Sequence, residues 1–194
     1  DVLYAIVRAL CDAHALPGRP AALALWLNAG LPPYVAYHNG LTPAALDRRE
    51  VPAASFERLV KTCLDVDRRE MLLFPIEELV GLKTYEQLYA LARAQAGRLG
   101  LTQPDRGESA ECFSAQSLLA IHFLQDGREG QSRAAFGRYL RASLAGGDDG
   151  AAFLAAFDGA QRASLDAGFY DYLFAEYERT FPGRPADRRV LAQH

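Results

Sequence analysis

Closely spaced turns divide the C-terminal half of this chain into helical segments, and this spacing constrains the fold more than any other feature. The predicted helices span about 110–125, 129–145, 149–157 and 160–181, and the turns between them are Asp126-Gly127, Gly146-Gly147 and Asp158-Gly159. No segment alternates apolar and polar residues with β-branched side chains for long enough to form a typical strand. The sequence therefore predicts a mainly α-helical fold with few or no strands.

The N-terminal half predicts shorter helices that prolines and glycines interrupt. Their expected ranges are 2–15, 20–29, 54–66, a short helix that opens at Pro75 and ends at Gly81, and a helix that ends near Leu99. Thr84 and Gln87 have the spacing of a capping box at the start of that last helix. We expect Gly30-Leu31-Pro32-Pro33 to end the helix over 20–29, and residues 100–109 to form a loop.

Length and charge limit the classes of function. With 194 residues the chain has the size of one domain, which we place at residues 1–181, followed by a polar tail at 182–194. A net charge of −3 argues against a nucleic-acid-binding protein, which normally carries a basic surplus. No apolar run approaches the roughly 20 residues that span a bilayer, so we expect no transmembrane segment.

The three cysteines, Cys11, Cys63 and Cys112, lie far apart in the sequence and are odd in number. They have neither the spacing of a metal site nor that of a disulfide framework. Because free cysteine is commonly buried, we expect buried free thiols.

Three stretches in a fixed order carry a resemblance to a known family. The first is a helix followed by Trp26-Leu27-Asn28-Ala29-Gly30-Leu31, ending at Tyr34, and the second is Leu73-Phe74-Pro75-Ile76-Glu77-Glu78-Leu79. The third begins with Phe113–Leu124 and continues through Phe136-Gly137-Arg138-Tyr139-Leu140, 152–157 and 165–173. Together they resemble the peptidase-MA-like domain of bacterial gluzincin metallopeptidases over nearly the whole chain.

That resemblance implies a zinc site at four positions of this sequence. Active members hold zinc with two histidines one helical turn apart and a carboxylate from a second helix, and a glutamate beside the first histidine acts as general base. Here the histidine positions are Tyr4 and Arg8, the general-base position is Ala5, and the third-ligand position is Ala29. Alanine offers zinc no donor, and arginine brings a permanent positive charge to the place of the cation.

The differences from the family pattern fall on the zinc-ligand and general-base positions, whereas packing positions such as Trp26, Leu27 and Gly30 are kept. They indicate a catalytically inactive pseudo-metallopeptidase without zinc or another cofactor. The resemblance also implies that this chain is the multi-helix C-terminal part of a zincin-like (gluzincin) domain whose N-terminal sheet lies outside the sequence. We expect a protein-binding or scaffolding module in a larger assembly, in the bacterial envelope or secreted rather than cytoplasmic. The alternative is an active hydrolase with a non-standard or shared site.

The remaining polar residues offer weaker candidates. The histidines are His14, His38, His122 and His194, and we expect each to be a hydrogen-bonded or surface residue. Ser117 precedes His122 by five residues, which separates the two side chains on a helix. Asp148-Asp149 precede a helix and predict an N-terminal cap.

The last long helix carries two stripes of large side chains. One consists of Leu165, Phe169, Leu173 and Glu176, and the other, rotated by about 100°, consists of Tyr170, Phe174, Tyr177 and Phe181. One stripe suffices to dock a helix on its own core. The second stripe therefore indicates either deep burial or an interface with a protein partner.

Overall fold

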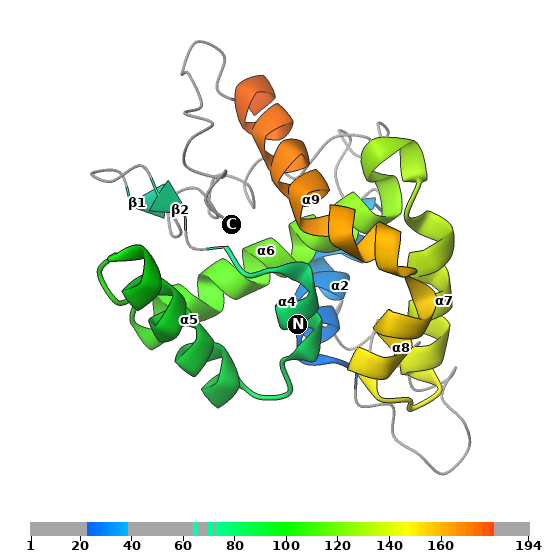
Figure 1. The fold of residues 1–194 in the computed structure, drawn as a ribbon, viewed down its shortest axis with the longest axis horizontal. Coiled ribbons are helices and arrows are strands. Elements are labelled where there is room, and N and C mark those ends of the chain that lie inside the picture. The colour runs from blue at the N-terminus through cyan, green and yellow to red at the C-terminus, as the bar shows by residue number, and fades with distance from the viewer. Residues whose placement is uncertain (1–22, 39–63, 66–69, 72, 181–194) are drawn as a thin grey trace.

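The computed structural model describes residues 23–38, 64–65, 70–71 and 73–180. Its elements in chain order are α2 (Leu25–His38), β1 (Leu64–Asp65), β2 (Glu70–Met71), α4 (Ile76–Gly81), α5 (Tyr85–Leu99), α6 (Arg106–Asp126), the 3-10 helix η2 (Gly127–Gly130), α7 (Arg133–Leu144), α8 (Asp149–Ala156) and α9 (Gly159–Thr180) (Figure 1). Helices account for most of the described residues, so the predicted mainly α-helical fold is confirmed. None of the described helices is long and apolar enough to cross a membrane. The helix predicted over 2–15 and the tail at 182–194 lie outside the described residues.

The two strands form one short antiparallel pair, in which Leu64 faces Met71 and Asp65 faces Glu70. The predicted helix over 54–66 is therefore wrong at Leu64 and Asp65, and residues 54–63 lie outside the described part. Helix propensity is a weak preference, and backbone hydrogen bonds to a neighbouring segment override it at these two residues.

Helix α6 lies at the centre of the fold, among α2, α5, α7 and α9 (Figure 1). Every residue from Ala115 to Leu124 is buried. A helix that is buried on all sides is an inner helix rather than one that covers a surface. Residues Phe113–Leu124 of the third stretch therefore belong to the element on which α2, α5, α7 and α9 pack.

Helix α2 lies very close to α6 at Gly30. A Cβ atom at Gly30 would lie 2.6 Å from the carbonyl carbon of Ser117 and 2.8 Å from the backbone nitrogen of Leu118. Only a residue without a side chain lets the two backbones approach this closely. We call this contact of Gly30 with Ser117 and Leu118 the crossing.

The predicted end of the helix at Gly30-Leu31-Pro32-Pro33 is wrong, because α2 continues through Pro32 and Pro33 to His38. Proline removes a backbone donor but keeps a φ angle that a helix accepts, so its cost is local. Packing against α6 keeps the chain helical at these two prolines despite the missing backbone hydrogen bonds. Gly30 serves the crossing and does not end the helix.

Two of the predicted caps are confirmed. Thr84 Oγ1 accepts a hydrogen bond from the Gln87 N–H at 3.2 Å, and Gln87 Oε1 accepts one from the Thr84 N–H at 3.2 Å. At the start of α8, Asp148 Oδ1 accepts from the Ala151 N–H at 2.9 Å. These side chains satisfy backbone donors that the first turn of a helix leaves free.

The predicted loop over residues 100–109 is too long, because α6 begins at Arg106. Asp105 and Glu108 form a second capping box, with Asp105 Oδ1 accepting from the Glu108 N–H at 2.8 Å and Glu108 Oε2 accepting from the Asp105 N–H at 2.9 Å. An Asp-x-x-Glu spacing was the available signal for this start.

Cys112 is buried on α6 and is disulfide-bonded. The expectation of free thiols is therefore wrong at Cys112, while Cys11 and Cys63 lie outside the described residues. A disulfide requires that two Cα atoms approach within about 7 Å, and sequence spacing does not reveal such an approach.

Candidate functional site

The structure describes one of the four predicted zinc-site positions, Ala29. The other three, Tyr4, Ala5 and Arg8, lie outside the described residues. Ala29 lies on α2 just before the crossing, is half-buried and packs against the core. Its methyl group has no donor atom, so this side chain offers a metal ion nothing to bind.

Trp26, the first residue of the same motif, is fixed by α7. Its indole Nε1 donates a hydrogen bond to Tyr139 Oη at 2.9 Å, and the two rings stack with their centroids 5.9 Å apart. The Phe136 ring, one turn earlier on α7, lies 6.1 Å from the Trp26 ring. All three side chains are buried, so the first and third stretches of the sequence meet here.

Burial raises the pKa of the Tyr139 phenol well above its ordinary value, because the phenolate would lose its hydration. The hydrogen bond with Trp26 favours the phenolate and lowers the pKa, and so does the one with Ser143, whereas the negative charge of Asp149 raises it. Burial dominates, so Tyr139 stays neutral at physiological pH.

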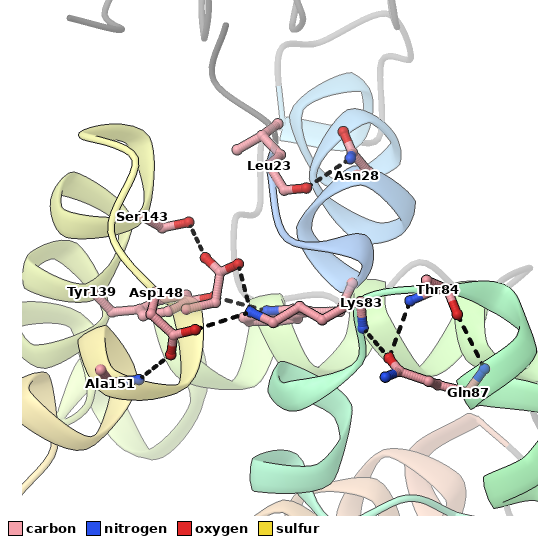
Figure 2. Close-up of polar contacts among 11 residues, drawn as sticks. Leu23, Asn28, Lys83, Thr84, Gln87, Tyr139, Ser143, Asp148 and Ala151 are labelled. Atoms are coloured by element: carbon pink, nitrogen blue, oxygen red, sulfur yellow. Dashed lines mark hydrogen bonds and ion pairs between the residues drawn. The ribbon is translucent and has the colours of Figure 1, made fainter. Parts of the chain in front are cut away.

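A chain of polar contacts continues from Tyr139 to the surface (Figure 2). Ser143 Oγ donates to Asp149 Oδ1 at 2.6 Å, and Lys83 Nζ lies 3.4 Å from Asp149 Oδ2. We call these residues, with Trp26, the polar network. It joins α2, α7 and α8 to Lys83, two residues before α5, and only its Lys83 end is exposed.

Local structure holds Lys83 at the end of the polar network. Its backbone N–H donates to Gln87 Oε1 at 2.7 Å, so the capping box at the start of α5 also positions Lys83 (Figure 2). Lys83 Nζ also lies 3.6 Å from Asp148 Oδ2. The Ala151 N–H and the positive charge of Lys83 together lower the pKa of the Asp148 carboxyl.

Serine, aspartate and lysine in contact resemble the components of a hydrolase, but the burial of Ser143 and Asp149 excludes this use. Ser143 is 3% exposed, and its hydroxyl is bound to Asp149. A nucleophile must reach the substrate, and a buried hydroxyl that donates to a carboxylate does not. The polar network is thus a structural connection.

Two glutamines hold the extended segment that precedes α4. Gln116 Oε1 accepts from the Phe74 N–H at 3.0 Å, and Gln116 Nε2 donates to the Phe74 carbonyl at 2.5 Å. Gln95 Nε2 donates to the Leu73 carbonyl. Neither glutamine is among the candidates predicted from the sequence, although a glutamine within an apolar helical segment is a signal, because a buried amide needs partners.

His122 is a buried, hydrogen-bonded histidine, which confirms that prediction. Its Nδ1 lies 2.7 Å from Tyr172 Oη, and the Tyr34 ring meets it edge-on with centroids 6.3 Å apart. Ser117 Oγ has no hydrogen-bond partner within the part of the chain that the structure describes, His122 included, so Ser117 and His122 do not form a nucleophile pair.

The predicted partner interface on α9 is corrected at Tyr170. This residue is 7% exposed and belongs to the core, and its burial raises the pKa of the phenol to about 12. Phe174 is half-buried against the same core. The side chain of Tyr177 and all of Phe181 lie outside the described part. The burial alternative therefore holds at Tyr170, because α9 lies against the core with more than one face.

Two further findings concern metal binding and similarity to known proteins. Across residues 23–38, 64–65, 70–71 and 73–180, no three His, Cys, Asp or Glu side chains gather into a group that could hold a metal ion. No family model, no curated protein and no solved structure matches this chain. The resemblance to gluzincin domains therefore rests on the sequence stretches alone.

Proposed function

We propose that this chain is a catalytically inactive relative of gluzincin metallopeptidase domains and that it serves as a protein-binding or scaffolding module in a larger assembly. The observation that carries the proposal is Ala29, where a zinc-binding carboxylate is expected and a half-buried methyl group is found. A catalytic zinc site needs three protein ligands, supported by a second shell of hydrogen bonds.

The packing around Ala29 supports this proposal. Trp26 and Leu27 are completely buried, and Gly30 makes the crossing with α6. This helix keeps its packing residues and has lost the side chain that would do chemistry. Such a combination is expected of a domain that is retained for its shape.

The polar network supports a binding role in a different way. Its serine, aspartate and lysine are the nearest alternative to a catalytic group in the described part of the chain, and they join helices instead of facing a substrate. A network that connects helices in this way fits a domain whose shape is used for binding or for holding other molecules.

The test is metal content and hydrolysis in the full chain and in Ala29→Glu. We expect elemental analysis after dialysis against zinc to find far less than a stoichiometric amount in both proteins, because one restored carboxylate does not make a three-ligand site. Ala29→Gln is the matched control for side-chain size without charge, and circular dichroism checks the fold. Stoichiometric zinc in the full chain, or peptide hydrolysis by Ala29→Glu, would contradict the proposal.

A further inference from the structure

Helix α5 lies at the edge of the fold, and one of its faces is exposed (Figure 1). Four buried residues hold the helix on the core: Leu88, Ala92, Gln95 and Ala96. The opposite side carries Glu86, Ala90 and Arg93, which are all exposed. Spacings of four and three residues place these side chains on one stripe of the helix surface.

Two tyrosines border this stripe on the side of α6. Of the aromatic side chains that the structure describes, Tyr85 alone is exposed. Its ring stacks on Tyr89 with centroids 6.1 Å apart and meets the buried Phe113 ring edge-on at 6.4 Å. The Arg106 guanidinium lies over the Tyr89 ring, 5.2 Å from its centroid. These contacts hold both tyrosines in place, and rigid tyrosines supply contact area at a low cost in entropy.

The two charges of the stripe are not used in the monomer. Among the described residues, no side chain forms an ion pair with Glu86 or Arg93. The two residues are also about 10 Å apart along the helix axis, too far to pair with each other. The stripe therefore has a negative and a positive end, and it is complementary to its own reversed copy.

A second α5 that lies antiparallel to the first satisfies both charges. With a two-fold axis between Tyr89 and Ala90, Glu86 of each copy faces Arg93 of the other, because both residues are equally far from the axis. Tyr89 then lies beside the axis, and the small Ala90 side chain lets the helices approach. A parallel arrangement would place each charge beside its like, so the charges favour the antiparallel pair.

We propose that the exposed face of α5, formed by Glu86, Tyr89, Ala90 and Arg93 with Tyr85 at its edge, is the interface of a homodimer. The same surface on both copies is the usual arrangement of a two-fold dimer. A helix of 15 residues is about 22 Å long, so this contact is at the small end of specific interfaces and the dimer dissociates on dilution. The interface goes beyond the proposed function and depends on neither zinc nor Ala29.

The test is sedimentation equilibrium of the full chain from about 10 μM to about 1 mM. We expect a monomer–dimer equilibrium that weakens as salt is raised. Glu86→Arg and Arg93→Glu should each weaken association about tenfold, because both symmetric pairs become pairs of like charge. An equimolar mixture of these two variants should associate like the parent, because every reversed charge again faces an opposite one.

Arg141→Glu is the matched control, at an exposed arginine on α7, which lies across the fold from α5 (Figure 1). It should associate like the parent, and circular dichroism checks the fold of each variant. Three outcomes would overturn the interface: a monomer at every concentration, a single reversal on α5 that associates like the parent, or a mixture that associates no better than its components. Zinc in the full chain would contradict the inactive peptidase and leave the interface standing.

Discussion

Helix α2 is held in two different ways by its neighbours. At the crossing with α6, Gly30 lets two backbones touch, and the contact depends on a missing side chain. Against α7, Trp26 is held by the polar network, which depends on donors and acceptors and ends at the exposed Lys83. The crossing should therefore be sensitive to added volume and indifferent to pH, whereas the polar network should respond to lost atoms and to proton binding.

The largest effect is expected from Gly30→Ala. The new methyl group would lie 2.6 Å from the backbone of α6, which has no flexible side chain that could move aside. Overpacking of this kind costs about 3 kcal/mol of unfolding free energy. Urea denaturation followed by circular dichroism measures the loss.

Gly97→Ala is the matched control for Gly30→Ala. Apart from the backbone of its own helix, no atom of the described residues lies within 4 Å of the Cβ position at Gly97, which is exposed on α5. Alanine is the better helix former, so this variant should gain up to about 1 kcal/mol. Similar effects of the two substitutions would show that the crossing is looser than the distances indicate.

High pH should weaken the protein through its buried tyrosines. Burial raises the pKa of Tyr170 to about 12 and places that of Tyr139 higher still. Above the ordinary tyrosine pKa of about 10, the unfolded chain loses protons that the folded chain keeps, so stability that is complete below this pH falls as the pH rises. The slope approaches about 1.4 kcal/mol per pH unit for each tyrosine.

Urea denaturation at about pH 9 and at about pH 11 measures this loss, since the two conditions bracket the ordinary tyrosine pKa. Gly30→Ala should keep the same pH dependence as the parent, because the crossing has no titrating group. Constant stability across this range would mean that the two phenols are hydrated in the folded protein.

Tyr139→Phe should cost less than Gly30→Ala. It removes the oxygen that accepts from Trp26 Nε1 and leaves a buried indole N–H without a partner. An unsatisfied buried donor costs about 2 kcal/mol. The variant should also lose part of the alkaline response, and Tyr85→Phe, at a tyrosine that is 42% exposed, is the control. An unchanged stability would mean that the hydrogen bond contributes nothing to folding.

Local spacing was sufficient for some elements of the fold and insufficient for others. The Thr84–Gln87 capping box, the short helix that ends at Gly81 and the Asp148 cap follow from residues only a few positions apart, and the structure confirms them. The continuation of α2 through Pro32 depends on packing against α6, which lies far away in the sequence. Local propensity predicted a break because it carries no information about that contact.

The residues of the candidate site also fall into two groups, those that a short motif predicts and those that depend on contacts between distant segments. The sequence identified Ala29 and Trp26 because they belong to one short motif. The polar network was not predicted, because Lys83, Ser143 and Asp149 lie in separate segments of the chain. Their contacts exist only after α7 and α8 have packed. A sequence shows which side chains are polar, but partners from distant segments appear only in the fold.

The smallest effect is expected at the surface end of the polar network, where Lys83→Met removes the charge and keeps the stem. The Lys83 side chain is 46% exposed, so water screens its attraction to Asp149, and the loss should stay below about 1 kcal/mol. The pKa of Asp148 should rise toward its ordinary value, because only the hydrogen bonds from the backbone would still lower it. NMR titration of the carboxyl group measures that change, and Lys83→Arg should largely preserve the low pKa. A loss as large as that of Gly30→Ala would instead mean that buried Asp149 depends on Lys83 for its charge balance, and the polar network would then be held from its surface end rather than from Trp26.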